Sequence, residues 1–72
     1  MGTSYNVYRY DGKRYHFICQ VDADNVRNAL QKAREVNAEA KGYEFTQLTA
    51  RSLESEKRIG YRLDAWTPDS DK

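Results

Sequence analysis

Apolar residues recur every three or four positions along the middle of the chain, which indicates an amphipathic helix. Half of this stripe is alanine, so the helix should approach a sheet closely and leave the bulk of the core to the strands. The segment from residue 21 to residue 42 therefore predicts one helix laid across a small antiparallel sheet. Asp24 is the preferred N-cap, with Asp22 as the alternative, and Gly42 suits a left-handed position after the last turn. The stripe consists of Val26, Ala29, Leu30, Ala33, Val36 and Ala40.

Two alternating segments on either side of Asp11-Gly12 predict a β-hairpin over residues 5–21. A two-residue loop would put Tyr5 and Val7 on the face away from Phe17. A three-residue loop, with Gly12 in the left-handed conformation of a bulge, shifts the pairing by one residue. We favour the longer loop because it separates an apolar face from a mostly polar one. The apolar face would then hold Tyr5, Val7, Tyr15, Phe17, Cys19 and Val21, and the other face Asn6, Tyr8, Arg14, His16, Ile18 and Gln20.

The segment after Gly42 predicts a third strand over residues 43–49. Tyr43 and Phe45 would face the helix. Leu48 has the opposite parity, so either a bulge turns it inward or it stays exposed.

The last part of the chain alternates polar and apolar residues over residues 59–63, which predicts a fourth strand. Residues 50–57 are polar and would form a loop or a short helical turn, and Trp66 would cover the end of the core. The predicted fold is α+β in the order ββαββ. It has one helix on a four-stranded antiparallel sheet of order 2-1-3-4, whose other face is open.

Composition and charge restrict the function. Seventy-two residues form one domain, which we place at residues 5–66 between a flexible start (1–4) and a disordered polar tail (67–72). The formal charge of +1 is far from the basic balance of a dedicated nucleic-acid binder. No apolar run is long enough for a membrane span. The single cysteine fits a reducing cytosol, so the expected location is cytoplasmic.

Groups for catalysis are sparse. His16 and Cys19 lie three residues apart on a predicted strand, so their side chains would point to opposite faces. Asp22 and Asp24 suit capping and turns better than an acid–base pair. We therefore expect no catalytic residues, no metal, no cofactor and no small-molecule substrate.

What remains is the predicted open face of the sheet, which combines tyrosine and arginine, the residue types enriched at binding hot spots. The first hypothesis is a non-catalytic protein-binding module. The alternative is a nucleic-acid-binding module that uses the same face, disfavoured by the low net charge. Reversing the charges of Arg51 and Arg58 should weaken partner binding at least tenfold, and reversing Arg27 and Lys32 much less. The candidate partner-binding residues are Tyr8, Arg14, His16, Arg51, Arg58 and Arg62.

The run YHFICQVDADNVRNALQKA followed by GYEFTQL resembles the core of the small phage-encoded inhibitors of host RNA polymerase. The resemblance covers about half the chain. It implies a strand, an alanine-punctuated helix and a second strand, and a function as an inhibitor that docks on a host enzyme such as RNA polymerase or a defence complex. The family's polymerase-contacting strand carries arginines where this chain has Gln47 and Thr49, with Arg51 the nearest replacement. The matching positions are Phe17, Ala23, Ala29, Leu30, Ala33, Gly42, Glu44 and Thr46.

Overall fold

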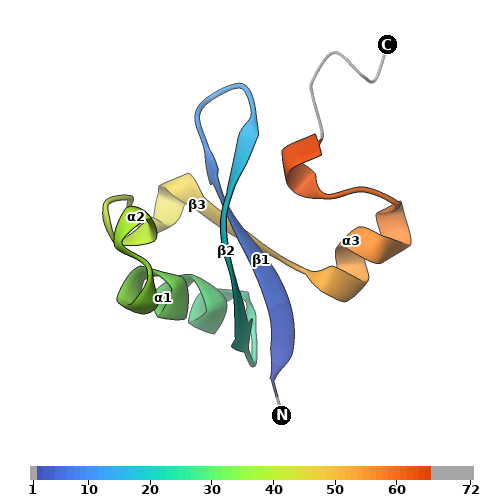
Figure 1. Ribbon diagram of the computed structural model, residues 1–72, viewed down its shortest axis with the longest axis horizontal. Coiled ribbons are helices and arrows are strands. Elements are labelled where there is room, and N and C mark those ends of the chain that lie inside the picture. The colour runs from blue at the N-terminus through green and yellow to red at the C-terminus, as the bar shows by residue number, and fades with distance from the viewer. Residues whose placement is uncertain (1, 66–72) are drawn as a thin grey trace.

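The computed structural model describes residues 2–65, so the roles predicted for Trp66 and for the tail lie outside the described residues. Within them the chain forms three strands, three α-helices and two short 3-10 turns (Figure 1). The first strand begins at Thr3, so residues 3 and 4 belong to the sheet. In chain order the elements are β1 (Thr3–Tyr10), β2 (Tyr15–Ala23), α1 (Val26–Val36), α2 (Ala38–Lys41), η1 (Phe45–Gln47), β3 (Leu48–Ser52), α3 (Leu53–Ile59) and η2 (Leu63–Ala65).

The sheet is antiparallel with the order β2-β1-β3, so the fold is α+β with three strands and not four. The predicted neighbours of the central strand are confirmed. The predicted third strand is displaced toward the C-terminus: it begins at Leu48, and residues 45–47 form η1. Leu48 pairs with Arg9 and is buried, which settles the question of its orientation.

The predicted fourth strand is wrong, because its residues lie in α3, the following turn and η2. The Ser52 hydroxyl accepts a hydrogen bond from the backbone N–H of Ser55 and so caps the start of α3. Gly60 ends the helix with φ +93°, a conformation that glycine adopts without steric cost. These two local signals outweigh a short alternating pattern.

The long helix is divided at Asn37, where the backbone is extended. The Asn37 side chain accepts hydrogen bonds from the N–H groups of Glu39 and Ala40, so it caps a separate short helix, α2. The N-cap of α1 is Asn25 and not Asp24, since Asn25 Oδ1 accepts from the N–H of Asn28 at 2.8 Å. The prediction of one continuous helix, with Asp24 as its cap and a left-handed Gly42, is corrected accordingly; Gly42 has φ −77°.

The hydrophobic core lies between α1 and one face of the sheet. Ala29 and Ala33 are fully buried, so α1 contacts the strands closely through its smallest side chains. A helix in such close contact buries only a narrow strip, and the flanking Val26 and Val36 are left exposed. The sheet supplies the larger core residues Tyr5, Val7, Val21, Leu48 and Ala50.

The hairpin has its bulge within β2 and not at the turn. Val7 pairs with Cys19, but Tyr8 pairs with Phe17, so Ile18 is the extra residue. Ile18 and Cys19 both pack against the core. From Phe17 to the turn, each side chain therefore points to the opposite face from the one that regular alternation would give. The single apolar face predicted for Tyr5, Val7, Tyr15, Phe17, Cys19 and Val21 is therefore divided between the two sides of the sheet.

The second face of the sheet is covered by α3 and η2, which corrects the prediction of an open face. Figure 1 shows α1 and α2 on one side of the strands and α3 on the other. Glu56 of α3 is buried, and its carboxylate accepts hydrogen bonds from Asn6 Nδ2 at 2.7 Å and from the Tyr8 hydroxyl at 2.6 Å. The backbone N–H of Leu63 donates to the same carboxylate at 2.6 Å. This polar cluster (Asn6, Tyr8, Glu56 and the Leu63 amide) fixes α3 and η2 to β1.

Candidate functional site

The structure separates the six residues predicted to bind a partner. Tyr8 is completely buried; its ring packs edge-on against Phe17 and its hydroxyl is bonded to Glu56 of α3. Burial and the adjacent carboxylate raise the pKa of Tyr8 to about 12. Tyr8 therefore belongs to the interior and is not available as a contact residue. The remaining candidates are all on the surface or at its edge: Arg14, His16, Arg51, Arg58 and Arg62.

Three of these five side chains lie next to a carboxylate. His16 Nε2 lies 2.6 Å from Asp11 Oδ2 beside the hairpin turn. This contact and the backbone N–H groups of the turn, with that of Arg14 foremost, hold the pKa of Asp11 well below its usual range. On α3 and after it, Arg58 lies 3.6 Å from Glu54 and Arg62 lies 3.1 Å from Asp64. The charges of Arg58 and Arg62 are thus balanced by nearby carboxylates.

A cleft of about 440 Å³ lies between α3 and the sheet. We call it the α3 cleft; Phe17 and Tyr61 on its rim are 40% and 44% exposed. The guanidinium of Arg62 covers the Phe17 ring at 4.4 Å from the ring centroid. The Phe17 ring is therefore already in contact with Arg62, which also pairs with Asp64, so the ring is less available to a partner. The cleft is lined by Asn6, Phe17, Gln20, Leu53, Glu56, Lys57, Gly60, Tyr61 and Arg62.

A larger groove of about 870 Å³ lies along α1, next to the Phe45 ring at the start of η1. Val26, Leu30 and Arg34 are four residues apart, so they form one ridge of the helix. Val26 and Phe45 are 46% and 45% exposed, and they provide apolar surface that the core does not use. We call this site the α1 groove; its lining residues are Val26, Arg27, Leu30, Gln31, Arg34 and Phe45.

The charge of the α1 groove is positive, and its arginines have no carboxylate within ion-pair distance among residues 2–65, although Glu35 lies in the hollow next to Arg34. The only charged lining residues of the groove are Arg27 and Arg34, and neither forms an ion pair within the part of the chain that the structure describes. The Arg34 guanidinium lies over the Phe45 ring at 4.7 Å from the centroid, in cation–π contact. Its Nε is buried and has no hydrogen-bond partner among residues 2–65. The groove therefore combines apolar surface with two cations that lack acidic partners.

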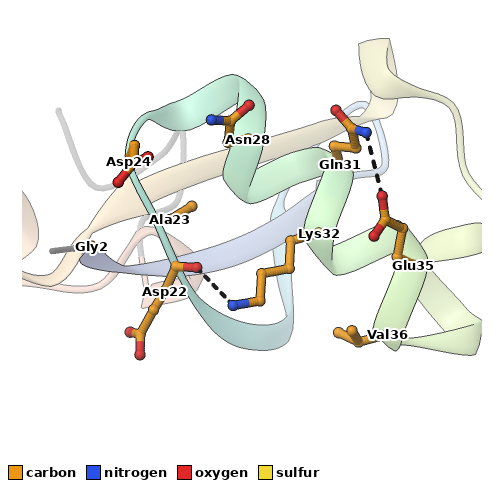
Figure 2. A pocket seen from close by; sticks show the side chains of 9 residues that line it. All are labelled: Gly2, Asp22, Ala23, Asp24, Asn28, Gln31, Lys32, Glu35 and Val36. Atoms are coloured by element: carbon orange, nitrogen blue, oxygen red, sulfur yellow. Dashed lines mark hydrogen bonds between the residues drawn. The ribbon is translucent and has the colours of Figure 1, made fainter.

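The third site is a polar hollow where the end of β2 meets α1 (Figure 2). Figure 2 shows Lys32 reaching the backbone oxygen of Asp22, at 3.0 Å, and Gln31 bonded to Glu35 at 3.3 Å. The Asp22 carboxylate accepts a hydrogen bond from the Ser4 hydroxyl at 2.7 Å. The polar groups of this hollow mainly satisfy one another, so it offers little to a ligand.

Side chains that could bind a metal ion do not converge at any of these sites. Residues 2–65 contain no set of three or more His, Cys, Asp or Glu side chains placed to hold a metal ion. Cys19 packs against the core, and its burial raises the pKa of the thiol, which lowers the fraction of reactive thiolate. Glu56 is buried, but all its described hydrogen-bond partners are structural. None of the described helices has both the length and the apolar character needed to cross a bilayer.

Comparison with protein families, with curated proteins and with solved structures yields no match to this chain. The resemblance to phage inhibitors implies a strand that carries Glu44 and Thr46. In the structure Glu44 caps η1 and Thr46 lies within it, so neither residue is in a strand. The sequence pattern assigned Phe45 and Val26 to the core side, but both are on the surface.

Proposed function

We propose that this chain is a small non-catalytic protein-binding module that docks on a larger protein through the α1 groove. One observation carries the proposal: apolar side chains about half exposed lie next to two arginines without acidic partners, in one groove. Exposed apolar surface rimmed by polar residues is typical of protein interaction sites. Arginine and aromatic side chains are also enriched at the centres of protein interfaces.

The choice between the α1 groove and the α3 cleft rests on charge. Arg58 and Arg62 beside the α3 cleft already have carboxylates within 4 Å, and a partner would have to displace them. Arg27 and Arg34 have no such competitor among the described residues. A carboxylate brought by a partner therefore gains more at the α1 groove.

The nucleic-acid alternative loses its central residue, because Tyr8 is buried and cannot stack on a base. The net charge of +1 also leaves little electrostatic attraction for a phosphate backbone. We keep nucleic acid as a control in the binding experiments.

Within the class of protein-binding modules, we propose an inhibitor that occupies a surface of a bacterial enzyme. The support is the sequence resemblance over residues 15–33 and 42–48, which makes bacterial RNA polymerase the first partner to test. The structure of residues 43–47 departs from the strand that the resemblance implies, so the contact surface would differ from that of the family. Purified RNA polymerase should retain the tagged chain at equal molar ratio, whereas a DNA fragment should not.

The binding surface is tested by two matched double variants. Val26→Ser with Phe45→Ser removes the exposed apolar surface of the α1 groove, and Phe17→Ser with Tyr61→Ser removes that of the α3 cleft. We expect the first to weaken binding to the purified partner at least tenfold in calorimetry, about 1.4 kcal/mol, and the second by less than twofold. Circular dichroism and urea unfolding check that both variants fold. The reverse ranking would show that the chain docks through α3, and an unchanged affinity in both variants would exclude both sites.

A further inference from the structure

We propose that the α1 groove receives an amphipathic helix of the partner, with its acidic residues against Arg27 and Arg34. This inference rests on the proposed function and adds the chemistry and the shape of the segment that is bound. It follows from the charge of the groove, the spacing of its two arginines and the form of its apolar surface.

The charge of the groove selects an acidic segment. Both charged lining residues are arginines, and no carboxylate lies among the six lining side chains. The Nε donor of Arg34 is not satisfied by any acceptor within residues 2–65. Arginine binds carboxylates through paired N–H donors, and such charge-assisted hydrogen bonds are stronger than neutral ones.

The spacing of the arginines selects a helix. Arg27 and Arg34 are seven residues apart, which is about two turns and roughly 10.5 Å along α1. A partner helix that lies along α1 would present acidic residues at the same seven-residue interval on one of its faces. Its apolar residues three and four positions after the first acid would then fall between the two arginines, opposite Leu30, and Val26 would extend the contact one residue beyond Arg27. Phe45 would form the far wall of this contact.

Two other occupants fit less well. A second copy of the chain, docked groove to groove, would bring the arginines of one protomer close to those of the other. Such like-charge contacts disfavour association. A nucleic acid would satisfy the arginines, but its phosphates would leave the apolar surface of Val26 and Leu30 unused.

The test uses a synthetic alanine-based helical peptide as the probe. It carries two glutamates seven residues apart and leucines three and four residues after the first glutamate. Its control replaces both glutamates by glutamine and keeps the leucines. Titration of the isotope-labelled full chain, followed by NMR, should shift the methyl signals of Val26 and Leu30 and the Nε–H signals of both arginines. We expect the glutamate peptide to bind at least tenfold more tightly than the glutamine peptide, and added salt to reduce the difference.

Charge reversal gives the second arm. Arg27→Glu with Arg34→Glu should abolish binding of the glutamate peptide and should create binding of a peptide with lysines at the same two positions. Arg51→Glu with Arg58→Glu, which changes the net charge equally, should leave the glutamate peptide bound.

Equal affinity of the glutamate and glutamine peptides, the absence of shifts in the groove, or an unaltered affinity in the Arg27/Arg34 variant would each overturn the inference. A separate result tests the proposed function. It survives if the purified partner loses affinity for the Val26/Phe45 variant while the Arg27/Arg34 variant binds that partner normally.

Discussion

Replacement of Glu56 by alanine should destabilise the whole domain, because this one carboxylate connects three parts of the chain. It accepts hydrogen bonds from the side chains of Asn6 and Tyr8 on β1 and from the backbone of Leu63 in η2. Glu56→Ala removes all three bonds and leaves three buried donors without an acceptor. Removal of one partner from a buried charged network costs about 3–5 kcal/mol. A chain of 72 residues has a total stability of roughly 4–11 kcal/mol, so the loss should be a large fraction of it.

Glu56→Gln separates the charge from the geometry. The glutamine oxygen can still accept from Tyr8 and from the Leu63 amide, and its Nε2 can donate to Asn6 if that amide group turns its oxygen inward. The hydrogen bonds become neutral and roughly half as strong. We therefore expect a loss of about 1–2 kcal/mol, clearly smaller than for alanine.

The free energy of unfolding would be measured by urea denaturation followed by circular dichroism, and hydrogen exchange of the Leu63 amide would report on η2. Glu54→Ala on the same helix is the matched control, since its side chain is 81% exposed and its ion pair with Arg58 should contribute less than about 0.5 kcal/mol. A loss below about 1 kcal/mol for Glu56→Ala, or equal losses for alanine and glutamine, would refute the view that the carboxylate holds α3 on the sheet.

Two further predictions concern the same side of the molecule. The pKa of Tyr8 is raised to about 12, so the folded protein binds this proton more tightly than the unfolded chain; stability should be retained below pH 10 and fall between pH 10 and pH 12, and Tyr8→Phe should remove that fall in urea unfolding. Gly60→Ala should cost about 1 kcal/mol, because φ +93° strains any L-residue, whereas Gly42→Ala at φ −77° should cost less than about 0.5 kcal/mol in the same assay.

The hairpin and the alanine-rich helix could be predicted because each depends on a periodicity that extends over ten or more residues. The order of the first three strands could be predicted because it makes every neighbouring pair antiparallel. The bulge at Ile18 could not. A single extra residue in β2 is tolerated because both faces of the sheet are covered, so Phe17 finds apolar and aromatic neighbours on the α3 side, including Tyr8 at 5.8 Å between ring centroids. If only one face of the sheet is assumed to be covered, the sequence pattern gives no reason to place a bulge within the strand.

The error at the C-terminus has a different cause. Residues 59–63 alternate over only five positions, and such a short pattern does not distinguish a strand from the end of a helix followed by a turn. The sequence did contain the opposing signals: Ser52 before an acidic first turn, Lys57 and Arg58 in the last turn, and Gly60 after it. The burial of Glu56 depends on a tertiary contact and had no local signal.

The location of the α1 groove follows from the alanines in the helix stripe. A helix packed through Ala29 and Ala33 approaches the sheet so closely that side chains on the flanks of the stripe cannot all be buried.

Val26 and Val36 are both such flanking residues, and their surroundings can be compared within one helix. Val36 lines the polar hollow, where Lys32 is bound to the backbone oxygen of Asp22 and the carboxylates of Asp22 and Glu35 have local partners. Val26 lies in the groove with Phe45 and two arginines that no described acid neutralises. An exposed valine alone means little, but the combination at Val26 leaves both apolar surface and positive charge unpaired, and a partner that supplies an apolar side chain and carboxylates together would satisfy both.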